Sequence, residues 1–300
     1  MEASIINGTT IASDLRTSIA EEALSLTRRG TQPGLAVILV GEDPASVSYV
    51  TAKEKACDEN GIYSREIRLP GDTSEKQLLD IIRDLNTDDQ IHGILVQLPL
   101  PEHIHDEHII EAISPEKDVD GFHPVSLGRM LQGQSTFLPC TPHGIIKILE
   151  AIEFSPSGKH VVILGRSNIV GKPLANMLLS KGKWGDATVT VCHSRTPNLK
   201  DHTIQADLLI AAVGRPKLVT EEMVKPGAVV IDVGTNRVPD ESKKSGFRLV
   251  GDVDFDAVKK KAKAITPVPR GVGPLTITML LFNTVQSAKN TLEKKIQSSR

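Results

Sequence analysis

Short apolar runs of strand length alternate with segments of helical period along almost the whole chain. Runs such as the one from Leu35 to Val40 are rich in Val, Ile and Leu and end in Gly or a small polar residue. Continuous apolar strands of this kind are typical of parallel sheets covered on both faces, and their alternation with helices is the pattern of βαβ units. The pattern therefore predicts the α/β class.

The first half of the chain carries one set of these elements. The sequence predicts three strands there, in GLAVILVG, YSREIRLP and GILVQLPLP. After the first strand, the turn EDPAS predicts a helix that Asp43 caps and that has Pro44 in its first position. Ser74 followed three residues later by Gln77 is the pattern of a capping box, which predicts a second helix containing LLDIIRDL.

The second half begins again with a separate set of elements. We expect parallel strands in HVVILG, ATVTVCHS, ADLLIAAVG, GAVVIDVG and FRLVGDVD. A helix from about Thr141 to Ile152 should join the two halves. The last amphipathic stretch, from roughly Thr276 to Ile296, is long enough for a helix that packs back on the first half.

The length of the chain also favours two domains, because 300 residues are more than one hydrophobic core usually serves. We predict an amino-terminal αβα domain over residues 1–140, completed by a helix over residues 276–300. Residues 141–275 are predicted to form a Rossmann-like domain.

Composition and charge exclude several classes of protein. A formal net charge of −2 with evenly mixed signs offers no basic surface for nucleic acid. The amino terminus has no signal-peptide pattern, and the apolar runs are too short to span a bilayer, so we expect no membrane partner and a cytoplasmic location. Cys57, Cys140 and Cys192 lack paired spacing and are interpreted as reduced thiols.

The loop GRSNIVGKP, residues 165–173, stands between a predicted strand and a predicted helix. A nucleoside-triphosphate P-loop needs four residues between its glycines and a hydroxyl after the Lys, whereas five residues and Pro173 stand here. A helix amino terminus after a strand still presents backbone amides to a phosphate, and Pro173 suits a first turn. The loop, with Gly165 and Gly171, therefore favours a dinucleotide over a magnesium triphosphate.

The end of the next strand indicates which dinucleotide binds. NAD sites usually have Asp or Glu there, whereas this strand ends in His193-Ser194-Arg195. Arg195 and Arg166 can bind a 2′-phosphate that a carboxylate would repel, so NADP is predicted. Arginines on the surface of an ordinary α/β fold are the alternative. Gly214 and Gly234, at other strand ends, are further places for backbone to approach a cofactor.

Candidate chemistry in the first half lies near the predicted strand ends. Tyr49 and Lys53 are four residues apart and share one face of their helix. Spacing alone also fits a half-buried Tyr beside a solvated Lys. Gln97 ends an apolar strand, where a buried amide needs a hydrogen-bond partner. Asp118 and Asp120, in KDVDGFHP, are candidates for turn chemistry or for contact with a donor-rich ligand.

Six motifs together resemble the bifunctional methylenetetrahydrofolate dehydrogenase/methenyltetrahydrofolate cyclohydrolase family. In chain order they are YVTAK (49–53), VQLPLP (96–101), KDVDGF (117–122), PCTP (139–142), GRSNIVGKP and TPVP followed by GVGP (266–274). The resemblance covers nearly the whole chain. It implies NADP-dependent oxidation of 5,10-methylenetetrahydrofolate to 5,10-methenyltetrahydrofolate and hydrolysis of the latter to 10-formyltetrahydrofolate. These steps of one-carbon metabolism serve purine biosynthesis.

The resemblance also implies a homodimer and roles for single residues. Lys53 would be the acid/base group, Tyr49 would stack on the folate, Gln97 would hydrogen-bond to Lys53, and Asp120 would hold the pterin. The other residues that match family contacts fall into two groups. Those on the folate side are Val96, Leu98, Pro269, Gly271, Val272 and Gly273, and those on the cofactor side are Gly165, Arg166, Ser167, Ser194 and Thr235.

One departure from the family pattern is clear, because PVPRGVGP has Arg270 where the family usually has glycine. Loss of one of the two folate activities therefore stays an alternative. Two further alternatives are a nucleotide-binding regulator or P-loop phosphotransferase, and an enzyme of similar architecture with another substrate, such as an amino-acid dehydrogenase.

Two other features are interpreted as structural. His103, His105 and His108 in HIHDEH resemble a metal-binding tract but are more typical of a polar helix start, and no metal is predicted. Cys140 and Cys57 are interpreted as small packed residues rather than nucleophiles.

Overall fold

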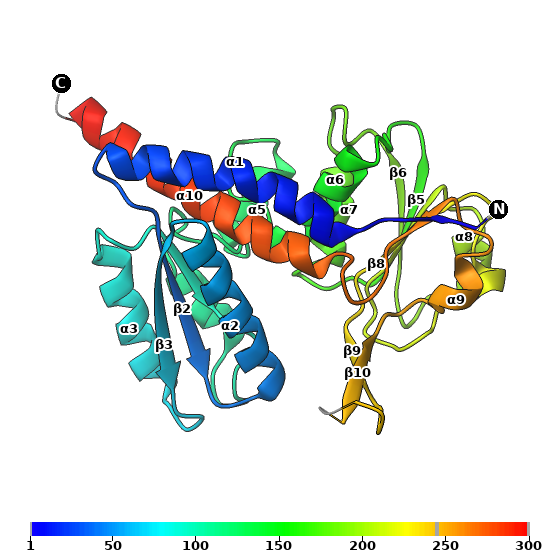
Figure 1. The fold of residues 1–300 in the computed structure, drawn as a ribbon, viewed down its shortest axis with the longest axis horizontal. Helices are drawn as coiled ribbons and strands as arrows, with labels where there is room; N and C mark the ends of the chain where they lie inside the picture. Colours follow the sequence, from blue (N-terminus) through cyan, green and yellow to red (C-terminus); the bar gives the residue numbers. More distant parts are fainter. Residues whose placement is uncertain (1, 244–245, 299–300) are drawn as a thin grey trace. The chain divides into compact units, whose positions relative to one another are not determined.

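The structure, a computed structural model, describes residues 2–243 and 246–298 and divides into two compact units. The three-stranded unit comprises Asp14–Cys140 and Ile277–Arg300, and the six-stranded unit comprises Met1–Ser13 and Thr141–Thr276. Both units combine a parallel sheet with helices, as Figure 1 shows. The predicted α/β class is thereby confirmed.

The three-stranded unit contains a parallel sheet in the order β3-β2-β4. Its strands are β2 (Gly34–Val40), β3 (Tyr63–Leu69) and β4 (Gly93–Val96), in the segments where the sequence predicts them. Every residue of β2 and of β4 is buried. Both faces of these strands are therefore covered, as their continuous apolar sequences require.

Alternate residues of β2 enter two separate cores. Leu35, Val37 and Leu39 pack in one core with α1 (Gly8–Arg28), α2 (Pro44–Glu59) and α10 (Gly273–Ser298). The residues between them pack in another with α3 (Glu75–Thr87) and α4 (Asp106–Ala112). Because the α10 residues Met279 to Leu292 join the first core, the prediction that the last helix packs on the first domain is confirmed.

The helix starts follow the local sequence signals. Asp43 accepts a hydrogen bond from the backbone N–H of Ser46 at 2.8 Å, and α2 begins at Pro44, as predicted. The predicted capping box at the start of α3 is also present, with Ser74 and Gln77 bonded reciprocally. Side-chain capping of this kind satisfies backbone donors that the first turn leaves free, so each boundary is encoded locally.

The six-stranded unit contains a sheet in the order β1-β11-β8-β7-β5-β6, in which every paired strand is parallel. The strands are β1 (Ser4–Ile5), β5 (His160–Leu164), β6 (Thr188–Cys192), β7 (Leu208–Ala211), β8 (Val229–Asp232) and β11 (Ala264–Ile265). Because β1 pairs with β11, the segment before α1 belongs to this unit, although the sequence analysis places it in the first domain.

The strand predicted in FRLVGDVD is present, but the prediction that it is a parallel strand like the others of this half is wrong. Its strand, β10 (Phe247–Val250), pairs antiparallel with β9 (Asn236–Pro239) in a separate two-stranded sheet. None of the residues of either strand is fully buried, unlike those of β7 and β8. A strand covered on both faces needs a continuous apolar run. Arg248 interrupts the run in β10, which indicates that this strand is not covered on both faces.

The remaining helices connect these strands. They are α5 (Pro124–Leu131), α6 (Cys140–Ala151), α7 (Gly171–Leu179), α8 (Leu199–Thr203), the 3₁₀ turn η1 (Glu221–Met223) and α9 (Phe255–Val258). The bounds of α6 agree within one residue with the predicted bridging helix. Within the described residues, no helix has the length and apolar content needed to cross a bilayer.

Candidate functional site

The strand order of the three-stranded unit creates a switch point between β2 and β4. The connection after β2 leads to β3 on one side, whereas β4 lies on the other side. In open parallel sheets, ligands bind at the carboxyl ends of two strands whose connections diverge in this way. Gln97 stands at this edge, directly after β4, and its backbone N–H donates to the carbonyl of Ile38 in β2 at 2.9 Å.

Lys53 and Gln97 meet at this switch point. Lys53 lies on α2, the helix that follows β2, and its Nζ donates to Oε1 of Gln97 at 2.9 Å. Nε2 of Gln97 donates to the carbonyl of Leu98 at 2.7 Å, which fixes the orientation of the amide. Gln97 thus has the partner that its apolar surroundings require, and only 9% of Lys53 is exposed.

Burial and the neighbouring carboxylate shift the pKa of Lys53 in opposite directions. Burial lowers the pKa of Lys53, and the nearby carboxylate of Asp120 acts in the opposite direction without reversing the shift. Burial likewise raises the pKa of Asp120, against the effect of the Lys53 charge. The ammonium group of Lys53 therefore gives up its proton more readily than that of a solvated lysine does.

Cys140 completes this buried cluster without the properties of a nucleophile. Its thiol donates to the carbonyl of Val119 at 3.3 Å, and burial raises its pKa well above the ordinary value. Cys57 is also buried, and its pKa is raised to about 12, mainly by burial. A thiol with a raised pKa is a poor nucleophile, which agrees with the interpretation of both residues as packed side chains.

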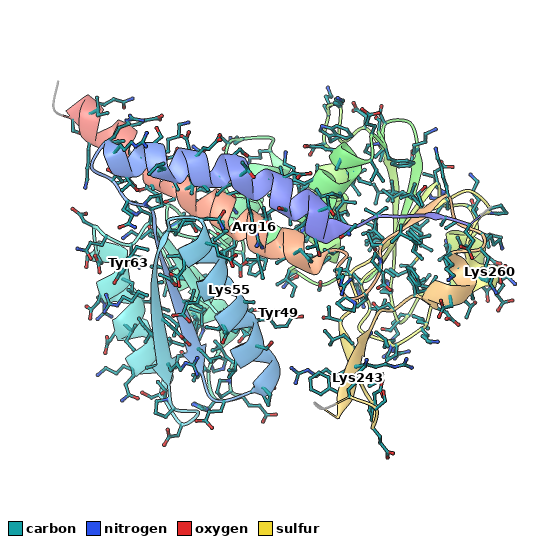
Figure 2. All side chains as sticks on the ribbon, viewed as in Figure 1. Arg16, Tyr49, Lys55, Tyr63, Lys243 and Lys260 are labelled. Atoms are coloured by element: carbon teal, nitrogen blue, oxygen red, sulfur yellow. The ribbon has the colours of Figure 1, made fainter. Side chains whose placement is uncertain are left out.

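Asp118 and Asp120 have different environments. Asp118 is buried and accepts hydrogen bonds from the backbone N–H groups of Gly121, Phe122 and His123 and from the hydroxyl of Ser126. Asp118 therefore serves the turn, whereas the half-buried Asp120 lies beside Lys53. Tyr49 is 41% exposed and extends outward from α2, so its ring has a face available for a ligand (Figure 2).

The loop before α10 belongs to the six-stranded unit. Arg270 has φ +80°, in the left-handed region that favours glycine, and its carbonyl accepts from the backbone N–H of Gly8 at 2.9 Å. A side chain on Gly8 would collide with the carbonyl of Gly271. The loop is thus held tightly by backbone contacts, with the exposed Arg270 in a conformation that the usual glycine adopts at lower cost.

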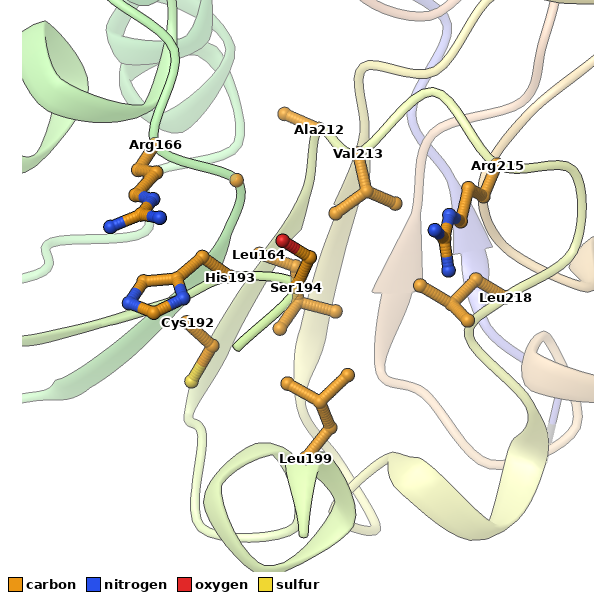
Figure 3. A pocket seen from close by; sticks show the side chains of 11 residues that line it. Leu164, Arg166, Cys192, His193, Ser194, Leu199, Ala212, Val213, Arg215 and Leu218 are labelled. Atoms are coloured by element: carbon orange, nitrogen blue, oxygen red, sulfur yellow. The ribbon is translucent and has the colours of Figure 1, made fainter. Parts of the chain in front are cut away.

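A pocket opens at the corresponding switch point of the six-stranded sheet, between β5 and β7. The ends of three parallel strands and the segments after them line it, with Gly165 and Arg166 after β5, Cys192 at the end of β6 followed by His193 and Ser194, and Ala212, Val213 and Arg215 after β7. Leu164, Leu199 and Leu218 complete the lining. Arg166 and Arg215 lie on opposite sides of this pocket (Figure 3).

The residues of the pocket fit a dinucleotide that carries an extra phosphate. A side chain on Gly165 would collide with the carbonyl of Ala212, and one on Gly171 would collide with the carbonyl of Gly165. These glycines therefore allow β5, β7 and the start of α7 to approach closely. Among the described residues, the lining includes Arg166 and Arg215 but no carboxylate, so its charge suits a phosphate.

Of the residues predicted on the cofactor side, Gly165, Arg166 and Ser194 line this pocket, whereas Ser167, Gly171, Arg195, Gly214 and Thr235 are not part of its lining. The hydroxyl of Ser167 accepts from the backbone N–H of Val170 at 3.1 Å, which supports the first turn of α7. Arg195 is exposed, and its backbone N–H donates to Nδ1 of His193 at 3.1 Å. Gly214 follows β7 with its N–H bonded to Asp252, and Thr235 is exposed in the segment after β8.

Two features of the structure were not predicted from the sequence. Arg215 lines the pocket, and its position just after a predicted strand and Gly214 was the available signal. Glu75 accepts from His105 and His108, each at 2.9 Å, so HIHDEH has a distant partner on α3. The histidine hydrogen bonds hold the pKa of Glu75 at about 2, and His103 bonds instead to the carbonyl of Thr73.

Comparison with known proteins identifies both units. The model of the tetrahydrofolate dehydrogenase/cyclohydrolase catalytic domain matches residues 6–120, and the model of the NAD(P)-binding domain of the same family matches residues 139–292. The chain belongs to the tetrahydrofolate dehydrogenase/cyclohydrolase family.

Relatives of this family are similar over nearly the full chain. The bifunctional protein FolD of Bacillus anthracis is 59% identical over 289 residues, which are 96% of this chain and 98% of the relative. The crystal structure of the bifunctional FolD enzyme from Campylobacter jejuni has a TM-score of 0.91 at 50% identity, covering 96% of this chain and 99% of the other. The FolD structure from Trypanosoma brucei, complexed with NADP and an inhibitor, has a TM-score of 0.93 at 41% identity, with coverage of 97% and 99%.

These matches confirm the family and the enzyme class that the sequence predicts. The protein is a bifunctional tetrahydrofolate dehydrogenase/cyclohydrolase of one-carbon metabolism with an NADP-binding domain. The alternatives of a P-loop phosphotransferase and of an amino-acid dehydrogenase are not supported by any of these matches.

Proposed function

We propose that Lys53 is the proton acceptor of the cyclohydrolase step and that the three-stranded unit binds the folate. The observation that carries this proposal is the hydrogen bond of 2.9 Å between the buried Lys53 and Gln97 at the carboxyl end of β4. A general base needs both a suitable pKa and a fixed position, and this arrangement supplies both.

The proposed hydrolysis follows from the charge balance at Lys53. Water attacks the methenyl carbon of 5,10-methenyltetrahydrofolate, and Nζ of neutral Lys53 takes one proton from it. The bond from this carbon to N5 then breaks while the hydroxyl proton moves to N5, which gives 10-formyltetrahydrofolate. The proton taken up by Lys53 is the one proton released in total. Burial favours the neutral amine, while the acceptor Gln97 holds one N–H and leaves the lone pair free to accept.

Asp120 and Tyr49 are proposed to bind the substrate beside Lys53. The two carboxylate oxygens of Asp120 match the adjacent donors on the amino-pyrimidinone edge of a pterin. The exposed ring of Tyr49 offers a stacking surface one helical turn before Lys53. Val96 and Leu98 are the remaining residues of the three-stranded unit that we assign to folate binding.

The pocket between β5 and β7 is the proposed NADP site. Arg166 and Arg195 are assigned to the 2′-phosphate, and Gly165, Ser167, Gly171, Ser194, Gly214 and Thr235 are the other residues assigned to the cofactor. When bound, NADP supplies the hydride acceptor for oxidation of the methylene carbon. The protein has to position donor and acceptor, because the methenyl cation that results is shared between two folate nitrogens.

Paired assays test this function and the role of Lys53. The purified protein should convert methylenetetrahydrofolate to methenyltetrahydrofolate with NADP, and it should hydrolyse added methenyltetrahydrofolate faster than buffer does. Lys53→Met should lower the hydrolysis rate by about a hundredfold or more, because it removes the proton acceptor. Lys55→Met is the matched control, since the Lys55 side chain is 77% exposed on the same helix.

Hydrolysis by Lys53→Met within about twofold of the unchanged protein would remove Lys53 from this role. Dehydrogenation without hydrolysis in the unchanged protein would instead point to the Lys53 cluster or to Arg270 in the loop before α10.

The rate of hydrolysis should rise with pH, because only neutral Lys53 accepts a proton. Burial lowers the pKa of Lys53 from 10.5, so the midpoint of this rise should lie below that value. The measurement is the initial hydrolysis rate against pH, corrected for the uncatalysed reaction at each pH. A midpoint at or above 10.5 would contradict a buried, destabilised ammonium group.

Arg166→Ala should raise the KM for NADP by about tenfold, because a charged hydrogen bond to a phosphate is lost. The KM for NAD should change less, since NAD lacks the 2′-phosphate. Arg248→Ala, in the same unit but outside the pocket lining, controls for a general loss of positive charge. Equal changes for NADP and NAD would show that Arg166 does not read the 2′-phosphate.

We also propose that the enzyme is a cytoplasmic homodimer. The support for a dimer is the family resemblance, and the support for the location is the set of three buried free thiols. Sedimentation equilibrium should give twice the chain mass of 32.4 kDa, and a mass of one chain at working concentration would refute the dimer. Fractionation of cells that express the protein would test the location.

A further inference from the structure

Asp252 is a buried carboxylate beside the cofactor pocket that none of the steps above uses. It follows β10 and is fully buried. Its Oδ2 accepts from the backbone N–H of Val213 at 2.6 Å and of Gly214 at 3.0 Å. Its Oδ1 accepts from the backbone N–H of Arg215 at 2.8 Å and from Nδ2 of Asn236 at 2.9 Å.

Three consecutive backbone N–H groups that converge on one anion form a nest, a structure that often binds phosphate. Gly214 has φ +65°, the left-handed conformation that such a turn requires at one position. Here the carboxylate of Asp252 fills the nest. The amides at the end of β7 are therefore not available to the phosphates of a dinucleotide, which leaves that task to the Gly165–Ser167 loop and the arginines.

The position of this nest ties Asp252 to the pocket. Val213 and Arg215, whose amides Asp252 holds, both line the pocket (Figure 3). Two backbone hydrogen bonds support the same connection, from Lys217 to the carbonyl of Gly251 at 3.1 Å and from Val219 to the carbonyl of Asp252 at 2.9 Å. The wall of the pocket after β7 is thus fixed to the segment after β10.

A second buried carboxylate holds Asp252 in place. Asp232, the last residue of β8, accepts from the backbone N–H groups of Asp252 and Val253, each at 2.9 Å. The N–H of Asp232 donates to the hydroxyl of Thr266 at 2.7 Å. A side chain on Gly251 would collide with Asp232, so the sequence leaves room for this contact. Hydrogen bonds therefore link β8 to the pocket wall after β7, through Asp232 and then Asp252.

We propose that Asp252 is a positioning residue of the cofactor site, which acts by holding the backbone from Val213 to Arg215 in the conformation that NADP binds. This inference rests on the assignment of the pocket to NADP made above. It predicts that loss of the carboxylate weakens NADP binding while the Lys53 cluster, in the other unit, is unaffected.

Asp252→Asn tests the proposal, because it keeps the shape but turns a donor toward the amides. We expect the KM for NADP to rise about tenfold or more and kcat of dehydrogenation at saturating NADP to change by less than about threefold. Hydrolysis of added methenyltetrahydrofolate without NADP should be unchanged. Asp256→Asn is the matched control, since its carboxylate is 83% exposed and pairs with Lys259 at the surface.

A second variant covers the case in which Asp252→Asn does not fold. Asn236→Ala removes one of the four donors to Asp252 and leaves its carboxylate in place, so it should raise the KM for NADP by a smaller factor, of about threefold. An unchanged KM for NADP in each folded variant would overturn the proposal, even with a lowered Tm. If the unchanged protein does not use NADP at all, the assignment of the pocket itself fails.

Discussion

The central strands β2, β4, β7 and β8 are buried along their whole length, so polar side chains can reach a ligand only at the ends of these strands. In both units the strand order reverses at one point, between β2 and β4 in one sheet and between β5 and β7 in the other. The connections diverge there, so a space opens that no crossover helix fills. The Lys53 cluster lies at the first of these points and the pocket lined by Arg166 and Arg215 at the second, so the strand order brings the residues of each together.

The Lys53 site depends on a competition between burial and charge. A lysine that is only 9% exposed loses most of its hydration, which favours the neutral amine. Asp120 restores part of the preference for the ammonium form, but burial prevails and the pKa stays lowered. A neutral acceptor, Gln97, fixes the amine without adding a charge that would raise its pKa. A carboxylate at position 97 would give the opposite electrostatic effect.

Buried carboxylates in this protein mostly organise backbone. Asp118 holds a turn through three amides, and Asp232 and Asp252 together hold the segment after β10 and the wall of the pocket. Burial raises the pKa of Asp118 and of Asp232 to about 6, while the backbone donors act against that rise. Backbone N–H groups thus compensate the loss of water without bringing in a second charged side chain.

The sequence by itself determined the α/β class, most strands and the helix starts, because these depend on apolar runs and on caps within a few residues, such as Asp43 and Ser74. It also singled out Lys53, Gln97 and Arg166 as candidates, because their motifs lie beside predicted strand ends; the structure joins Lys53 to Gln97 and places Arg166 in the lining of the pocket. Only the tertiary structure decided that β10 pairs with β9, that Arg215 lines the pocket and that Asp252 fills the nest. A periodic pattern predicts whether a residue is buried, but it does not predict which distant segment packs against that residue. The β9–β10 pairing, the place of Arg215 and the contacts of Asp252 all depend on distant segments.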